Sequence, residues 1–515
     1  MVSVRARWML AVIIAAMACG VGTRVLAQDL NVGPPPAPET RQDVAVPALP
    51  DEIDSVPATD VAAELKSLRE SVKRLEDEAQ KRRDAEQAKK DSDALKAAEW
   101  IDMSTDKWNL KFGGDVQLDY INWANADVAI SGPAAAPGTK DYFEFRRLRL
   151  VAEGTGYGVF DFRLQMTLET ATFGDTPPAG MNYTPDVKDA YFSVNEIPWL
   201  GRFRIGNFFV PFSLEQVTND RFNVFLERSI PVPGVFAADR EVGIAFYNCT
   251  DDLNVTWAYG AFINNVSESA KKKIDDNQGY RLSGRVTWLP YYDEPSNGRY
   301  LVHLGSGILY TEDNGTGVRL RARPQIHEGP RLIDSGLLDG VSASSGGLEA
   351  HATATGNVEL AVVWGPVTVQ SEAFLSNVNL TTGSRNVGGA YAHLSYFLTG
   401  ENRSYERFGQ HGAQFTRTIP YSNFFWVAGG HSWGAWEAKA RWSYLNLDSL
   451  NHVGTGASAG TKFGGQYNDL TVGMNWYWSD RTRVMFDWIH PVTNGQTTFG
   501  STHSDLLAMR FDFNW

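Results

Sequence analysis

Hydrophobic and polar side chains alternate with a period of two along most of the chain after residue 108. In residues 160–168, every second residue is Phe, Leu or Met, and the residues between are charged or polar. The same alternation ends the chain, where the apolar positions are Leu507, Met509, Phe511, Phe513 and Trp515. A period of two predicts β-strands whose two faces meet different surroundings.

Counting the alternating segments predicts sixteen strands. An even number brings both ends of a membrane barrel to the same side. Short and long connections also alternate, with one exception at 399–433. That link is long although its place in the order makes it periplasmic, so either it folds under the barrel or the count is wrong there. The predicted strands are 108–121, 143–153, 159–169, 187–195, 202–209, 241–248, 253–262, 278–288, 299–310, 356–364, 367–376, 388–398, 434–446, 467–478, 482–490 and 504–515.

The composition favours a membrane barrel over a soluble β-sandwich or propeller. Aromatic residues make up 12% of the chain, yet the mean hydropathy is only −0.28. No apolar run after the N-terminal region approaches the roughly 20 residues of a membrane-spanning helix. A sheet in lipid must close on itself to pair its backbone groups. We therefore predict an all-β fold, a 16-stranded antiparallel transmembrane β-barrel spanning 104–515.

Three regions precede the barrel. Residues 1–27 have the basic start, apolar stretch and small-residue cleavage site of a signal peptide, which predicts export. Residues 28–60 are rich in proline and predict an extended linker. In 61–99 the period changes, and apolar residues at spacings of four and three predict a short coiled-coil helix, a periplasmic stalk that would assemble a trimer. A single amphipathic helix is the alternative. The apolar seam consists of Val61, Leu65, Leu68, Val72, Leu75 and Ala79.

Several stretches in the predicted barrel resemble the phosphate-selective porin O/P family. They are 145–150, 206–216, 225–229, 395–402, 434–437, 441–445 and 475–477. The resemblance implies a trimeric outer-membrane porin whose third external loop folds inward and narrows the pore. That loop would be 210–240, and its candidate constriction residues are Glu215, Arg221, Glu227, Arg228 and Arg240. An ordinary external loop is the alternative. The aromatic C-terminus fits the signal by which the barrel-assembly machinery is engaged.

Strand parity indicates which charges line the lumen, but it does not settle selectivity. Eleven basic and thirteen acidic side chains are predicted to point inward, so the lumen is balanced by count. A tight hairpin about Gly156 would place Arg149 opposite Arg163, and strands near the closure would add further cations. The predicted basic wall consists of Arg147, Arg149, Arg163, Lys439, Arg441, Arg483 and Arg510.

Other functions are less well supported by the sequence. The nine His show no metal-ligand spacing, and there is neither a GxSxG elbow nor a P-loop, so we predict no enzyme activity, no metal site and no cofactor. The net charge of −13 argues against a nucleic-acid partner. After cleavage Cys249 would be the only cysteine, which excludes an internal disulfide. The predicted function is diffusion of small solutes, with a preference for anions such as phosphate. A non-selective general porin and a structural barrel that tethers the envelope remain alternatives.

Overall fold

The structure, a computed structural model, describes residues 101–102, 107–131, 139–168, 186–263, 279–313, 315, 317–425 and 432–515, together with Lys73. The chain divides into two units, 1–74 and 75–515. The predicted signal peptide and linker lie outside the described residues, and so does the predicted stalk except for Lys73, which is helical. Among the described residues, no helix is long and apolar enough to cross a membrane.

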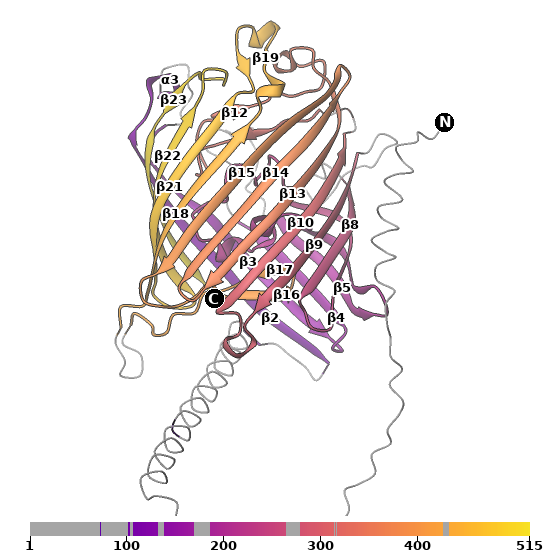
Figure 1. The fold of residues 1–515 in the computed structure, drawn as a ribbon, viewed down its shortest axis with the longest axis vertical. Coiled ribbons are helices and arrows are strands. Elements are labelled where there is room, and N and C mark those ends of the chain that lie inside the picture. The colour runs from indigo at the N-terminus through magenta and orange to yellow at the C-terminus, as the bar shows by residue number, and fades with distance from the viewer. Residues whose placement is uncertain are drawn as a thin grey trace, which may run out of the picture. The chain divides into compact units, whose positions relative to one another are not determined.

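Sixteen long strands form a closed antiparallel barrel, as predicted (Figure 1). The sheet has eighteen strands, but β1 (Ile101–Asp102) and β23 (Thr502–His503) have two residues each. Each long strand pairs with the next along the chain, and the last pairs with the first to close the ring. The long strands are β2 (Trp108–Asn125), β3 (Tyr142–Gly156), β4 (Phe160–Thr167), β5 (Asp186–Ile197), β6 (Gly201–Phe209), β7 (Arg240–Cys249), β8 (Val255–Ile263), β9 (Tyr280–Tyr292), β10 (Tyr300–Glu312), β13 (Ala350–Trp364), β14 (Val367–Leu380), β15 (Gly383–Phe397), β18 (Ala435–Asn446), β21 (Gln466–Tyr477), β22 (Thr482–Thr493) and β24 (Asp505–Asn514).

The observed strands extend beyond the predicted ones mainly at one end of the barrel. The predicted strand 356–364 starts at Ala350 in β13, and the predicted strand 388–398 starts at Gly383 in β15. Residues 383–386 are all exposed. Where both faces of a strand meet water, the alternation that marks the strand disappears, so the sequence pattern stops short of the strand.

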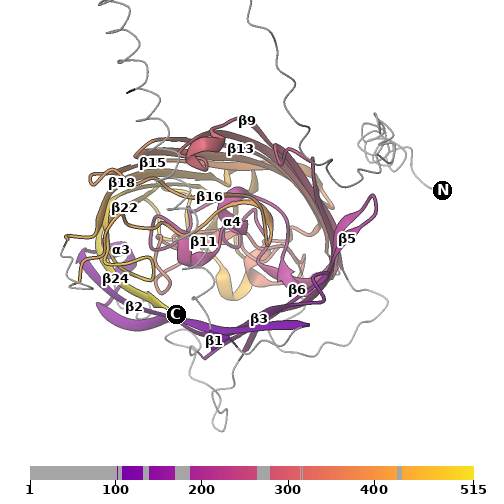
Figure 2. The same ribbon diagram turned by 90° about the horizontal axis from the view of Figure 1, so that it is seen from below.

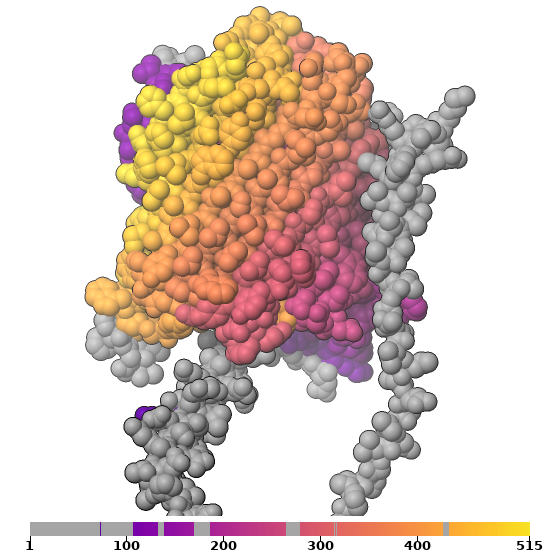
Figure 3. All heavy atoms as spheres, in the orientation of Figure 1, coloured from indigo at the N-terminus to yellow at the C-terminus, as the bar shows by residue number. Residues whose placement is uncertain are grey.

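The two faces of each strand meet different surroundings. The side chain of Leu375 is 63% exposed on the outside, whereas its neighbour Ser376 is 1% exposed on the inside. Figure 3 shows one part of this outer surface, over which the strands run obliquely. We call the end that carries the short connections and the C-terminus the turn end, and the opposite end the loop end.

Three segments occupy the interior of the barrel (Figure 2). The first, which we call the inner loop, is residues 210–239 between β6 and β7; it holds the short helix α4 (Leu214–Val217) and a 3₁₀ turn. The second, the turn-end hairpin, is residues 403–418 with β16 (Tyr405–Gly409) and β17 (Gly412–Phe415). The third, the mouth loop, is residues 317–349 between β10 and β13, with β11 (Arg321–Ala322) and β12 (Ile333–Asp334).

The turn-end hairpin explains the connection that broke the predicted alternation of lengths. It joins β15 to β18, so the sequence order placed it correctly at the turn end. The extra residues of the connection, 403–418, fold into the barrel. Arg285 on β9 donates to the carbonyl of Ala413 (2.9 Å), and the Tyr405 hydroxyl lies 2.7 Å from Nδ1 of His303 on β10.

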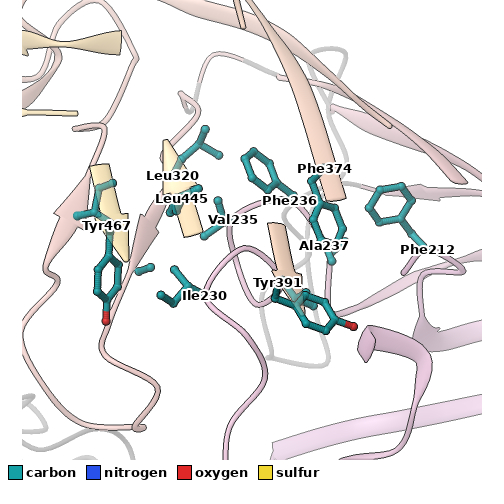
Figure 4. Close-up of a cluster of buried hydrophobic side chains, with 14 of the residues drawn as sticks. Phe212, Ile230, Val235, Phe236, Ala237, Leu320, Phe374, Tyr391, Leu445 and Tyr467 are labelled. Atoms are coloured by element: carbon teal, nitrogen blue, oxygen red, sulfur yellow. The ribbon is translucent and has the colours of Figure 1, made fainter. Parts of the chain in front are cut away.

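Apolar packing holds the inner loop against the wall (Figure 4). Phe236 stacks on Phe374 of β14 with ring centroids 5.8 Å apart, and Ile230 and Val235 are buried in the same cluster. Gly389 of β15 faces this loop. A Cβ there would lie 2.8 Å from the backbone carbonyl oxygen of Tyr444 on β18, 3.0 Å from Cβ of Pro231 and 3.1 Å from the Phe236 ring. The absence of a side chain at Gly389 therefore makes room for the loop.

We expect Gly389→Leu to displace the inner loop and alter single-channel conductance, because the new side chain must occupy the place of Pro231 and Phe236. The matched control is Gly388→Leu, whose side chain points outward. Planar-bilayer recordings measure the effect, and heat-modifiability on gels reports whether each variant forms a barrel. Equal conductance of the two variants would contradict the packing argument.

Candidate functional site

A β-bulge in β3 turns Arg146 toward the interior, in addition to Arg147 and Arg149. Arg147 pairs with Gln117 and Phe145 pairs with Leu118, so Arg146 is an extra residue in the strand. Arg146 and Arg147 therefore both reach the inner loop, together with Arg149. Strict parity had predicted only Arg147 and Arg149, because a bulge cannot be seen in a pattern of period two.

Asp220 of the inner loop forms ion pairs with three guanidinium groups. Its carboxylate lies 3.2 Å from Arg147, 2.9 Å from Arg149 and 2.6 Å from Arg228. Arg228 also donates to the carbonyls of residues 215, 216 and 218. Arg228 thus holds the loop in shape, in addition to its place among the predicted constriction residues.

Glu227 forms the second centre of the same network. Its carboxylate lies 2.7 Å from Arg146 and 2.7 Å from Arg510 on β24. Arg510 also pairs with Asp119 on β2 at 2.6 Å, across the seam where the barrel closes. The inner loop is therefore joined to the first, second and last strands.

Two further charges lie beside this network. Asp115 on β2 is directly across from Arg149, and both of its carboxylate oxygens are buried without a hydrogen-bond partner among the described residues. Arg221 follows Asp220 in the loop, is buried, and forms no ion pair with a described acid. We call the six arginines the basic cluster; they face four carboxylates, those of Asp115, Asp119, Asp220 and Glu227. The basic cluster is Arg146, Arg147, Arg149, Arg221, Arg228 and Arg510.

The cations predicted on β18 and β22 bind the backbone of the inner loop. Lys439 donates to the carbonyl of residue 224 (2.9 Å) and pairs with Asp487 (2.6 Å). Arg441 donates to the carbonyl of residue 227 (2.9 Å), and Arg483 donates to that of residue 223 (2.7 Å). Glu215 completes this side by accepting from the Ser229 hydroxyl (2.6 Å) and lying 3.3 Å from Arg441.

Arg163 and Arg240 lie apart from the basic cluster. The predicted opposition of Arg149 and Arg163 is wrong: Arg163 is opposite Glu153, and Arg149 is opposite Thr167. The reason is the turn, which is centred on Gly158 rather than Gly156, with positive φ at residues 157 and 158. Opposite charges are thereby paired across the hairpin.

Arg163 and Arg240 share Asp189, at 3.1 Å and 2.7 Å. Arg240 is the first residue of β7, so it belongs to the wall and not to the loop in which it was predicted. Its guanidinium group lies 3.9 Å from the centre of the Phe209 ring. Arg163 also pairs with Glu153, and Arg240 with Asp239, so the basic charge of this part of the wall is neutralised.

The turn-end hairpin contacts or contributes three cations that are not among the predicted site residues. Arg202 donates to the carbonyl of Gly409 (2.8 Å), and Arg403 donates to Gln370 (2.6 Å). Arg204 forms no ion pair with a described acid and lies 3.9 Å from the Tyr191 ring centre. The surplus length of 399–433 was the signal that could have pointed to this hairpin.

Two cavities remain beside the hairpin. One, of about 270 Å³, lies between the hairpin and the β2–β6 wall and is lined by both signs of charge, including Lys111, Glu153 and Arg202. A smaller one, of about 20 Å³, is lined by four arginines, Arg221, Arg417, Arg481 and Arg483. Both cavities are lined in part by charged side chains.

We expect Asp220→Asn to lower the free energy of unfolding by about 3 kcal/mol, because a buried carboxylate that balances three guanidinium groups is lost. The control is Asp239→Asn, whose side chain is 62% exposed and whose pairing with Arg240 contributes less than about 1 kcal/mol. Urea unfolding in detergent measures both. Similar losses in the two variants would contradict the central place of Asp220 in the network.

The comparisons with known proteins identify the family. The family model described as "Phosphate-selective porin O and P" matches residues 110–515. The chain belongs to this family. The match confirms the resemblance seen in the sequence and the prediction of an outer-membrane porin.

Individual relatives share less than a third of their aligned residues with this chain. Porin O of Pseudomonas aeruginosa is 24% identical over 441 residues, which covers 80% of this chain and 89% of that protein. An uncharacterized protein of Caulobacter vibrioides is 29% identical over 326 residues, and this match covers 59% of each of the two proteins. Among solved structures, the trimer form of OmpT from Vibrio cholerae covers 80% of this chain and all of its own, at 10% identity and a TM-score of 0.46. The anion-selective porin from Comamonas acidovorans covers 79% of this chain and 99% of its own, at 12% identity and a TM-score of 0.43.

Proposed function

We propose that this porin is a passive diffusion channel that prefers small anions, phosphate among them. The observation that carries the proposal is the basic cluster, in which six guanidinium groups face four carboxylates beside the inner loop. Guanidinium groups can replace the hydration of an oxyanion with paired N–H donors, and a confined site strengthens that attraction. The same guanidinium groups repel a cation.

The contacts of the predicted site residues support a distinct role for each group of them in this proposal. Arg147, Arg149 and Arg510 supply the attracting charge. Lys439, Arg441, Arg483 and Glu215 hold the inner loop in place. Arg163 and Arg240 are neutralised by Asp189 and its neighbouring acids. The channel requires no cofactor and catalyses no reaction in this proposal.

A general porin without selectivity is the second candidate, since basic side chains elsewhere on the inner wall are paired with acidic ones, as in Arg285–Glu359 and Arg483–Asp512. Purified protein in planar bilayers under a KCl gradient discriminates between the two. If the channel prefers anions, its reversal potential should lie between zero and the equilibrium potential of chloride, and added phosphate should reduce the chloride current. A reversal potential shifted toward the equilibrium potential of potassium would refute the anion preference. Silent bilayers would instead support a structural barrel.

We propose in addition that the porin is a homotrimer in the outer membrane, with 61–99 as a periplasmic stalk. The heptad seam of that segment supports this, because three helices can bury it together. The last strand would be the segment that the barrel-assembly machinery engages. Cross-linking of protein lacking 61–99 tests the stalk; trimers that survive as well as those of the full chain would argue against its role.

A further inference from the structure

Three metal-ligating side chains meet at the loop end of β3, outside the basic cluster. They are Glu144 of β3 and His327 and Glu328 of the mouth loop, and their ligand atoms all lie within 4.8 Å of one another. Oε2 of Glu144 is 2.8 Å from Nδ1 of His327, and Oε1 of Glu328 is 3.6 Å from the same nitrogen. Ligands of tetrahedral zinc, with bonds of about 2.0–2.1 Å, stand about 3.3 Å apart.

The hydrogen bonds of the cluster do not satisfy Glu144. Its side chain is only 10% exposed, and its Oε1 is buried without a hydrogen-bond partner among the described residues. A neutral imidazole has a single N–H, so at Nδ1 it can serve only one of the two carboxylates. A buried carboxylate oxygen without a partner is costly, and metal coordination is one way to satisfy it.

The mouth loop is held in position independently of these three groups. The Tyr142 hydroxyl donates to the carbonyl of Glu328 (3.0 Å) and accepts from its N–H (3.1 Å). Gln325 donates to Ser443 of β18 (3.1 Å) and accepts from Thr471 of β21 (3.1 Å). The ligand atoms are therefore brought together before any ion binds.

The charges suit a dication. An imidazole binds a metal ion in its neutral form and adds no charge to the site. Two carboxylates neutralise two positive charges. Arg146 opposes a cation, but it is paired with Glu227 at 2.7 Å.

We propose that Glu144, His327 and Glu328 form a binding site for a divalent transition-metal ion of the zinc type, which ties the mouth loop to β3 at the outer entrance of the pore. One imidazole and two carboxylates are ligands that such ions accept, with water completing the coordination. Glu144 and His327 are 183 residues apart, so no metal-ligand spacing marks this site in the sequence. Only the inward fold of the mouth loop brings them together.

Zinc titration of the full-length, detergent-solubilised protein, stripped with a chelator, tests the site by calorimetry. We expect one zinc ion per chain in the wild type and at least a tenfold weaker affinity in His327→Ala and Glu144→Gln. The control is His351→Ala, which removes an exposed histidine at the same end of the barrel and should bind zinc as the wild type does. Absence of zinc binding in the wild type, or equal binding in His327→Ala, would overturn the proposal.

A second measurement distinguishes metal coordination by these side chains from a cluster held together by hydrogen bonds alone. Zinc added to the outer side of a bilayer should reduce current fluctuations of the wild-type channel, because it fixes the mouth loop, and should leave those of His327→Ala unchanged. Heat-modifiability confirms that each variant is a barrel before it is compared. A zinc effect that persists in His327→Ala places the ion elsewhere and refutes the site. Neither measurement depends on anion preference.

Discussion

Removal of the turn-end hairpin is expected to raise single-channel conductance several-fold. The hairpin fills the lumen on the side of β9 and β10, where Arg285 and His303 contact it. Conductance follows the narrowest open cross-section, so taking a two-stranded segment out of the lumen should widen the path. Replacement of 403–418 by a short Gly-Ser linker makes the change without touching a barrel strand.

The matched control shortens a second hairpin at the loop end. Residues 455–460 form the tip between β19 (His452–Val453) and β20 (Lys462–Phe463), and they should not limit the flow. The reversal potential of the hairpin deletion should stay close to that of the wild type, because the basic cluster is formed mainly by other segments. Unchanged conductance would mean that the hairpin leaves the limiting section open, and the inner loop would then be the sole constriction.

The barrel could be predicted from the sequence because lipid imposes a strict rule on every strand. Residues such as Leu375 must be apolar outside, and residues such as Ser376 are free to be polar inside, so a period of two survives wherever the membrane is. The rule stops at the membrane border. The external ends of β13 and β15 were missed for that reason.

The register of neighbouring strands could not be obtained from the same pattern. The position of a turn centre depends on one or two backbone angles. A turn centred on Gly158 instead of Gly156 places Arg163 opposite Glu153 instead of Arg149. The bulge at Arg146 likewise changes which face a residue occupies without changing its neighbours in the sequence. Parity therefore predicted most inward charges but not their partners.

The candidate site depends most on segments that have no periodic pattern. The resemblance to a family correctly placed an inward loop at 210–240, and its phenylalanines suggested a packed segment. The contacts of Asp220 with three guanidinium groups were not predictable, because they join one loop residue to β3 and to Arg228. The hairpin at 403–418 and the mouth loop gave only their length as a signal.

Neutralising the arginines of β3 is expected to abolish or reverse anion preference. In Arg146→Gln/Arg147→Gln/Arg149→Gln, three guanidinium groups remain against four carboxylates, so the local charge changes sign. The ratio of anion to cation permeability should fall several-fold, with the reversal potential in a KCl gradient moving toward the potassium side. Glutamine keeps part of the length and hydrogen bonding of arginine, which limits the loss of packing.

The inner loop must stay in place for this result to be informative. Asp220 loses two of its three partners in the triple variant, so Asp220→Asn is added in a second version that has three guanidinium groups and three carboxylates. This version should be near neutral in selectivity. The control is Arg281→Gln, because Arg281 of β9 pairs with Glu241 away from the cluster. If the triple variant kept the wild-type reversal potential while Arg281→Gln changed it, selectivity would arise at the β7–β9 wall instead of at the basic cluster.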